Sequence, residues 1–298
     1  MKYSIKNSEN CPLVSIIMTF YNSNLTLSDA IASLLFQTYK NWELIFIDDG
    51  SKQDPSPIIE KFHDLNINYI KLDKNFGRGY AYQKGIDNAE GEFVMFLDAD
   101  DWWYSNKIEE QIAYMLNNSK INVLGTGIIS AQNNTPKSIR ANKEINNTKL
   151  ISLIDPPLAF ASVCIRRKIL CNYYFDDRLT VAQDIDFLQN LLMKEYFSNL
   201  SNELYVYNEY GSFKKSKMSL AWKNRILSLI KFRRKYPIAF LKHYMTIKFK
   251  SYLYNLFFLF GIENLILSHR GKKLSIEQSK VFKNEYSKLI KTKEKYFV

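Results

Sequence analysis

The stretch Gly91-Glu-Phe-Val-Met-Phe-Leu-Asp-Ala-Asp-Asp-Trp-Trp103 decides how the rest of the chain is interpreted. Its apolar run, Phe93–Leu97, predicts a buried strand, and open parallel sheets bind their ligands at the carboxyl ends of such strands. Three carboxylates follow the run directly: Asp98, Asp100 and Asp101. Because neighbouring carboxylates repel one another, we expect them to hold a hard divalent cation, Mg²⁺ or Mn²⁺, on a diphosphate. The alternative is a solvated acidic loop that caps a helix near Ser105.

Three more apolar runs precede this stretch, and segments with apolar residues at helical spacing separate them. These runs are Leu13–Phe20, Trp42–Ile47 and Asn68–Leu72. The second run ends in Asp48-Asp49-Gly50-Ser51, which places turn chemistry and two carboxylates at a strand end. Strands that alternate with helices over short connections predict an α/β protein with a Rossmann-like, doubly wound sheet.

Beyond residue 103 the pattern of apolar runs continues. Apolar spacing predicts a helix through Ile108–Leu116, and further strands at Asn122–Ile129, Leu158–Ile165 and Glu203–Tyr207. Residues 130–149 are rich in Asn, Ser, Thr and Lys, and we expect a mobile loop over or beside a ligand. Trp102 and Trp103 are expected to pack in the core, although one ring could stack on a sugar.

Charge is unevenly distributed along the 298 residues, whose net charge is +11. Residues 1–209 contain 20 Lys and Arg against 26 Asp and Glu, whereas residues 210–262 contain 12 against none and residues 263–298 contain 9 against 4. We therefore expect two parts, a catalytic domain over 1–212 and a basic helical extension over 213–298. Such an extension favours a polyanionic partner, either nucleic acid or an anionic membrane surface.

The extension interleaves aromatic and basic residues at helical spacing, with a break near Pro237. Its most apolar run, Tyr252–Leu267, is too short and too polar for a membrane span, so an interfacial helix on an anionic leaflet is expected. Helices that pack on the catalytic domain are the alternative. Nucleic-acid binding is disfavoured, because the aromatic residues follow apolar spacing and the N-terminal part is net acidic. A capping box, Ser275 to Gln278, predicts the start of a last helix.

Three cysteines, Cys11, Cys164 and Cys171, lack metal-binding CxxC spacing and favour a reduced, cytoplasmic compartment. The first apolar run, Leu13–Phe20, is too short and begins too far into the chain for a signal peptide. We therefore expect no export and a cytoplasmic protein, and the basic extension adds the expectation that it is peripheral on the inner face of the cell membrane.

Six motifs in one order resemble glycosyltransferase family 2, the inverting nucleotide-sugar transferases of GT-A fold. The similarity covers roughly residues 12–210. The motifs are Val14-Ser-Ile-Ile-Met-Thr-Phe-Tyr-Asn22, Ser33-Leu-Leu-Phe-Gln-Thr-Tyr39, Trp42-Glu-Leu-Ile-Phe-Ile-Asp-Asp-Gly-Ser51, Asn75-Phe-Gly77, Gly85-Ile86 with Ala89-x-Gly91-Glu92, and Phe96-Leu-Asp-Ala-Asp-Asp101. The resemblance implies a GT-A domain with a doubly wound mixed sheet, divided into a nucleotide-binding half (about 12–101) and an acceptor half (about 102–212).

The resemblance also implies roles for matching positions. Thr19 and Tyr21 would line the uridine pocket, and Asp49 would accept the uracil N3–H, unless it only caps the turn at Gly50. Asp98 would lie near the ribose or the water shell of the metal, and Ala99 would contact the nucleotide. Asp100 is the expected direct ligand of Mn²⁺ or Mg²⁺, with Asp98 as a possible second ligand, and Asp101 could be a helix cap.

Asp184, in Ala182-Gln-Asp-Ile-Asp-Phe187, matches the position of the catalytic base in this family. An inverting transfer is one in-line displacement, so a base must take the proton of the acceptor hydroxyl. A helix N-cap is the alternative for Asp184, and the two roles are compatible. Asp186 competes within the motif, but helical spacing places it on another face.

Two departures from the family pattern affect the site. Gln183 stands where many relatives have Glu before the base, and Ala81-Tyr82-Gln83 stands where they have Ala-Arg-Asn. We expect Arg78 to replace the missing arginine at the diphosphate, an exposed loop arginine being the alternative.

The resemblance implies transfer of a sugar from a UDP-sugar to a hydroxyl of a lipid-linked glycan in bacterial surface polysaccharide biosynthesis. Besides donor and acceptor, the expected partner is an anionic membrane surface, and no nucleic acid is expected. A catalytically inactive relative that binds nucleotide or glycan is the alternative, which the Asp98-x-Asp100 pair and Asp184 argue against.

Overall fold

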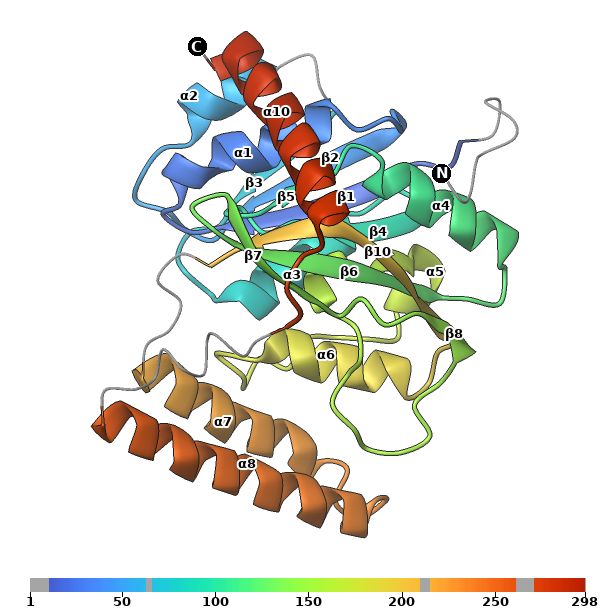
Figure 1. Ribbon diagram of the computed structural model, residues 1–298, viewed down its shortest axis with the longest axis vertical. Helices are drawn as coiled ribbons and strands as arrows, with labels where there is room; N and C mark the ends of the chain where they lie inside the picture. The colour runs from blue at the N-terminus through green and yellow to red at the C-terminus, as the bar shows by residue number, and fades with distance from the viewer. Residues whose placement is uncertain (1–10, 63–65, 210–214, 261–270, 298) are drawn as a thin grey trace.

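One mixed sheet organises the computed structural model, which describes residues 11–62, 66–209, 215–260 and 271–297 (Figure 1). Its main strand order is β3-β2-β1-β4-β9-β6-β10-β5, with β7 beside β6 and β8 beside β10. The strands are β1 Val14–Phe20, β2 Trp42–Asp48, β3 Ile67–Lys71, β4 Phe93–Phe96, β5 Trp102–Trp103, β6 Val123–Gln132, β7 Thr135–Arg140, β8 Ile145–Thr148, β9 Cys164–Arg166 and β10 Phe197–Asn208. The α/β class and the mixed sheet are confirmed.

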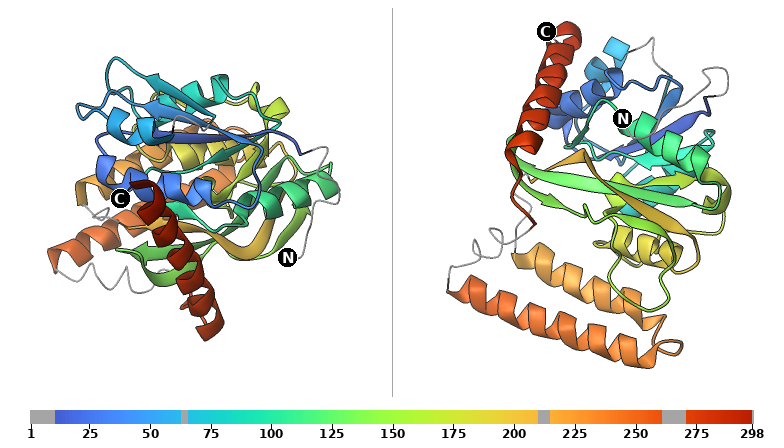
Figure 2. Two further views of the ribbon diagram at one scale, coloured as in Figure 1. Left: turned by 90° about the horizontal axis from the view of Figure 1, so that it is seen from above. Right: turned by 45° about the vertical axis from the view of Figure 1, so that its right-hand side comes forward.

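Helices pack on both faces of this sheet (Figures 1 and 2). They are α1 Asn24–Leu35, α2 Ser56–Ile59, α3 Arg78–Asp87, α4 Lys107–Asn117, α5 Arg167–Leu170, α6 Gln183–Leu192, α7 Lys215–Ile230, α8 Pro237–Leu259 and α10 Ile276–Phe297, with 3₁₀ turns at Glu60–Phe62 and Phe160–Ser162. Within the described ranges, no helix combines the length and hydropathy that a membrane span needs.

The parallel half consists of β3, β2, β1 and β4. Every residue of β1 is buried, because successive side chains supply two different core clusters. Ile16 packs in the cluster of α1, whereas Ile17 packs in the cluster of α3. The carboxyl ends of the parallel strands meet at one edge of the sheet, so the polar residues after β1, β2 and β4 gather there.

The mobile loop expected at residues 130–149 is wrong, because this segment forms strands in the other half of the sheet. Strand β6 continues to Gln132 and turns back through Asn133 and Asn134 into β7, while β8 pairs antiparallel with β10. Both asparagines have positive φ, 49° and 55°, which asparagine tolerates better than most residues, and such residues suit a two-residue hairpin turn. The polar composition therefore marks a half-exposed hairpin and edge strand.

The predicted strand Leu158–Ile165 is mostly wrong, because only its end belongs to β9, Cys164–Arg166. Leu158 and Phe160 are buried in the same core cluster as Tyr82, so their apolar character serves packing between segments. Strand β9 pairs antiparallel with both β4 and β6 and joins the two halves of the sheet.

The C-terminal helices occupy two separate places (Figures 1 and 2). Helices α7 and α8 lie side by side below α6, and the expected break falls at Pro237, where α8 begins. Helix α10 packs against α1 near the other end of the molecule. Its capping box is confirmed, since the Gln278 amide donates to Ser275 Oγ (3.1 Å) and the Ser275 amide to Gln278 Oε1 (2.8 Å). Residues 1–10, the start of the expected catalytic domain, lie outside the described residues. So do residues 261–270, which include the end of the apolar run Tyr252–Leu267.

Candidate active site

Asp101 is the structural member of the carboxylates that follow β4. Its side chain is fully buried, and its oxygens accept hydrogen bonds from the Tyr205 hydroxyl (2.6 Å) and the Asn208 amide (2.8 Å). The next helix starts only at Lys107, so Asp101 does not cap it. Asp101 instead fastens the acidic turn to β10, which corrects the helix-cap alternative.

Trp102 and Trp103 do not reach a ligand. Both rings are fully buried, and Trp102 packs against Phe282 of α10 with ring centroids 5.4 Å apart. The ammonium of Lys107 lies 4.8 Å from the centroid of the Trp103 ring. Core packing is therefore confirmed for this pair, and the sugar-stacking alternative is wrong.

The Asp98, Asp100 and Asp101 carboxylates form a candidate metal site, in which one oxygen of each lies within 4.8 Å of the others. Burial first, and then the charge of Asp98, raises the pKa of Asp100 above its ordinary value. Burial, with Asp100 and Asp98 adding to it, also raises the pKa of Asp101 well above its ordinary value. A bound divalent cation would stabilise the ionised carboxylates, and an all-oxygen donor set suits Mg²⁺ and Mn²⁺.

Of the three, Asp100 is the most available ligand. Among the residues that the structure describes, no other residue donates a hydrogen bond to its carboxylate, and its side chain is only partly buried. Asp98 is buried and already accepts a hydrogen bond from the Tyr82 hydroxyl. Asp100 is thus the carboxylate of this group that is most accessible to a ligand, with Asp98 beside it.

A cavity of about 380 Å³ opens beside these carboxylates and brings the predicted donor residues together. Its lining includes Thr19, Tyr21, Asp49, Arg78, Asp98, Ala99 and Asp100. These residues come from the ends of β1, β2 and β4 and from the start of α3, which the parallel sheet gathers at one edge. Thr180 also lines the cavity, and no sequence pattern pointed to it.

Asp49 does not cap the turn at Gly50. That contact belongs to Asp48, whose Oδ1 accepts from the Ser51 amide at 2.7 Å. The Asp49 carboxylate accepts instead from the amides of Phe76 (2.8 Å) and Gly77 (2.9 Å), which orient it at the cavity wall. Burial raises the pKa of Asp49, although the two amide hydrogen bonds act in the other direction.

Arg78 and Tyr82 lie one helical turn apart on α3, and both face Asp98. The Arg78 guanidinium lies 3.8 Å from Asp98 Oδ2, while the Tyr82 hydroxyl donates to Asp98 Oδ1. The Arg78 side chain is 56% exposed, so it can also reach a ligand in the cavity. Tyr82 was not among the site residues predicted from sequence, although its spacing of four from Arg78 indicates a shared helix face.

Asp184 lines a second cavity, of about 590 Å³, which lies between α6, the sheet and helices α7 and α8. Arg78 and Asp98 line both cavities, so the two spaces adjoin at those side chains. Burial raises the pKa of Asp184, and the charge of Arg78 acts to lower it. The N-cap of α6 is Ala182, with φ of 62° and no side-chain cap, so Asp184 belongs to the first helical turn.

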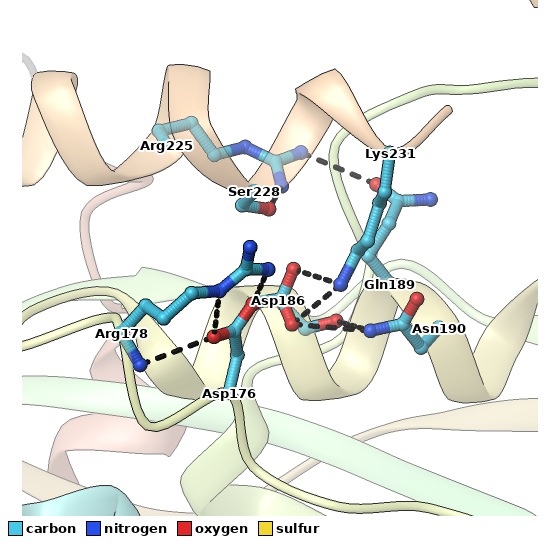
Figure 3. Close-up of polar contacts among 8 residues, drawn as sticks. All are labelled: Asp176, Arg178, Asp186, Gln189, Asn190, Arg225, Ser228 and Lys231. Carbon is cyan, nitrogen blue, oxygen red and sulfur yellow. Dashed lines mark hydrogen bonds and ion pairs between the residues drawn. The ribbon is translucent and has the colours of Figure 1, made fainter. Parts of the chain in front are cut away.

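Asp186 does not line the cavity that Asp184 lines and makes structural contacts instead (Figure 3). It is fully buried, and its Oδ1 lies 2.6 Å from Nζ of Lys231, which follows α7. Asn190 also donates to its carboxylate, at 3.1 Å. Nearby, Arg225 of α7 donates to Gln189 at 3.2 Å. Helix α6, which carries Asp184, is therefore fastened to the C-terminal extension.

Comparison with protein families gives a match to the family model described as glycosyl transferase family 2, over residues 15–169. The glucosyltransferase WfgD of Escherichia coli, named for transfer from UDP-Glc to alpha-D-GlcNAc-diphosphoundecaprenol with a beta-1,3 linkage, is 37% identical over 47% of this chain and 55% of its own length. The putative teichuronic acid biosynthesis glycosyltransferase TuaG of Bacillus subtilis (strain 168) is 34% identical over 42% of this chain and 50% of its own. The matched part thus spans about half the length of these relatives.

Solved structures share the fold over nearly the whole chain. S. aureus TarS in complex with UDP is 20% identical, with a TM-score of 0.60 over 94% of this chain and 80% of that chain. The mannosyltransferase PcManGT from Pyrobaculum calidifontis, in complex with GDP-Man and Mn²⁺, is 13% identical, with a TM-score of 0.60 over 98% and 89%. The fold is GT-A, as the sequence motifs predicted.

Proposed function

The chain belongs to glycosyl transferase family 2, and from this premise we propose that it transfers a sugar from a UDP-sugar to an acceptor hydroxyl with inversion at the anomeric carbon. One observation carries the proposal: the donor residues predicted from sequence line one cavity, and Asp184 lines the adjoining one. Donor and acceptor can therefore meet at Arg78 and Asp98, the two side chains that both cavities share.

We assign the nucleotide to the smaller cavity. The Thr19 backbone and hydroxyl and the Tyr21 ring would hold the uracil, Asp49 would accept its N3–H, and Ala99 would contact the ribose. The amides of Phe76 and Gly77 support this role, because they leave further lone pairs of the Asp49 carboxylate for a ligand. Complexes of the similar S. aureus protein with UDP and with UDP-GlcNAc also support a uridine donor.

Asp100, with Asp98 beside it, would hold Mn²⁺ or Mg²⁺ at the donor diphosphate. When bound, the ion would neutralise the charge that develops on the departing diphosphate. The Arg78 guanidinium would contribute a second positive charge there, in place of the arginine that the Ala81-Tyr82-Gln83 triplet lacks. Tyr82 keeps Asp98 in position through its hydroxyl.

Asp184 would accept the proton of the acceptor hydroxyl as that oxygen attacks the anomeric carbon. A base must be ionised to act, and burial opposes ionisation by raising the pKa of Asp184. The Arg78 charge and the amino end of α6 both favour the ionised form. Burial therefore raises the pKa of Asp184, while Arg78 and the amino end of α6 oppose that rise and favour the carboxylate that a base requires.

The acceptor we propose is a glycan on a lipid carrier, used in bacterial surface polysaccharide synthesis at the cytoplasmic face of the cell membrane. The names of the E. coli and B. subtilis relatives support this acceptor class. In this scheme residues 1–212 perform the transfer, with donor and acceptor halves at 12–101 and 102–212, and residues 213–298 associate with the membrane or pack on the catalytic part.

Incubation of the full chain with Mn²⁺, a panel of UDP-sugars and lipid-linked glycan acceptors tests the proposal, with UDP release and product mass as readouts. We expect both signals to depend on one UDP-sugar and on an acceptor. UDP binding without any turnover, unchanged in Asp184→Asn, would instead indicate an inactive nucleotide-binding relative.

A further inference from the structure

Helix α8 carries an exposed apolar stripe on its outer face. The stripe consists of Ile238, Leu241, Met245, Phe249, Tyr252 and Leu259, which are 85%, 58%, 58%, 62%, 62% and 74% exposed. Their spacings of three, four, four, three and seven residues keep them on one side of a helix. An apolar surface of this length is rare on a protein that needs no partner there.

The opposite face of the same helix lines the larger cavity. His243, Thr246, Ile247 and Lys250 follow one another at spacings of three, one and three, about half a turn away from the outer stripe. The buried side chain of Ile247 contributes to the small core between α7 and α8. Helix α8 therefore has two contact faces, and the described part of the chain covers only the inner one.

The positive charges around the outer stripe favour an anionic partner. Lys242 and Lys248 lie on its two edges by helical geometry, and Arg233, Arg234 and Lys235 precede the helix; all five are exposed. The sequence between 210 and 262 contains no Asp or Glu. A second copy of this chain would bring lysines against lysines, whereas an anionic lipid surface offers the complementary charge.

We propose that the outer stripe of α8 is a docking surface for an anionic lipid bilayer, on which the helix lies in the plane of the interface. The apolar side chains would enter the boundary between headgroups and acyl chains, and the long Lys242 and Lys248 side chains would reach the headgroups. This orientation agrees with a helix that is apolar on one outer face but does not meet the requirements of a membrane span.

Docking of this kind orients the active site. Helix α8 pairs with α7, and α7 is fastened to α6 through Lys231 to Asp186 and Arg225 to Gln189 (Figure 3). The cavity that contains Asp184 then lies between the catalytic domain and the membrane-bound helix. The inference rests on the proposed function in one respect, the lipid-carried acceptor, which this orientation would bring to the cavity.

Flotation of the full chain with vesicles tests the proposal. We expect binding to vesicles of phosphatidylglycerol and phosphatidylcholine at low salt, and little binding to phosphatidylcholine alone. Leu241→Glu with Phe249→Glu should lower the vesicle affinity by about tenfold or more, because each removes several buried methylene equivalents. Lys242→Ser with Lys248→Ser should weaken binding less and reduce its salt dependence.

Ile276→Glu is the matched control, because Ile276 is 80% exposed and belongs to α10, which lies away from α8 (Figure 1). This variant should float like the wild type. Equal flotation of the Leu241→Glu, Phe249→Glu variant would overturn the proposal. So would a wild-type dimer, seen in sedimentation without vesicles, that this variant dissociates. Thermal stabilisation by UDP, measured on the same preparations, reports the donor site separately, so a failed docking surface and a failed donor site are distinguishable.

Discussion

Two acidic motifs, the turn after β4 and the first turn of α6, follow the same plan with different partners. Each exposes one carboxylate to a cavity, Asp100 or Asp184, and buries a second one, Asp101 or Asp186. The buried Asp101 is held by neutral donors from β10, whereas the buried Asp186 is paired with the cation of Lys231. The turn after β4 is therefore completed within the sheet, whereas the first turn of α6 depends on the C-terminal extension.

The two motifs therefore depend on different parts of the chain, the turn after β4 on strand β10 and the first turn of α6 on helix α7. The donor site is braced by Tyr205, whose hydroxyl donates to Asp101 and accepts from the Asp98 amide at 3.3 Å. Helix α6, which carries the proposed base Asp184, contacts α7, and α7 also packs against α8, the proposed membrane-docking helix. We infer that disturbing the extension affects the base and the acceptor more than the donor.

The largest expected effect is the loss of turnover when Asp184 in α6 is replaced. Asp184→Asn should lower the transfer rate by about 10²- to 10⁴-fold, since general-base catalysis contributes that much, while UDP affinity stays within a few-fold of wild type. Asp186→Asn is the matched control within the same motif and should keep most of the turnover. Measured transfer rates of both variants test whether the two aspartates differ in role. Equal losses of turnover in the two variants would contradict that difference.

In the turn after β4, replacing Asp100 and replacing Asp101 should affect different properties, metal binding and stability. Asp100→Asn should abolish the dependence of UDP binding on Mn²⁺, because it removes the available ligand. Asp101→Asn should retain that dependence and lower the free energy of unfolding by about 1–3 kcal/mol, since it disturbs buried hydrogen bonds. Calorimetric titration of UDP with and without Mn²⁺, together with urea unfolding, measures both effects; loss of metal dependence in both variants would place the ligand on Asp101.

The pH dependence of kcat/KM tests the charge balance at the base. Because the pKa of Asp184 is raised by burial, activity should fall as the pH drops through that raised value, above the ordinary aspartate range. Arg78→Gln removes a positive charge that favours the ionised form, so the acidic limb should move to higher pH. A limb that stays in place or moves to lower pH would show that Arg78 does not act on Asp184.

The smallest effect is on stability at the contact between α6 and α7. Lys231→Met should lower the free energy of unfolding by about 1 kcal/mol, because the Lys231 side chain is 32% exposed and solvent screens its ion pair with Asp186. Lys223→Met on α7, where the lysine is exposed, is the control and should be near neutral. Chemical denaturation measures the free energy of unfolding of both variants. An equal loss of stability in Lys223→Met would show that the ion pair between Lys231 and Asp186 does not account for the loss in Lys231→Met.

Sequence alone predicted the parts of the molecule that depend on local patterns. Strands β1 to β4 and the acidic ends after them follow from apolar runs and turn residues close in the chain. The role of Asp101 could not be predicted, because its partner Tyr205 is distant in sequence and reaches it only in the folded sheet. Core packing was expected for Trp102, but its partner Phe282 could not be predicted, because α10 is also distant in sequence. Strands β7 and β8 were missed because short, half-exposed strands have the polar composition of loops.

The most direct test of the account is thermal stabilisation of the wild-type chain by UDP, GDP, CMP and dTDP, each with Mn²⁺ and with EDTA. A ligand that binds only the folded state adds about 2.7 kcal/mol of stability at 100 times its Kd. The account predicts a shift with UDP that requires Mn²⁺ and is lost in Asp100→Asn. No shift with any nucleotide, or a UDP shift that persists in EDTA, would contradict a metal-dependent uridine donor site at the Asp49 and Asp100 cavity.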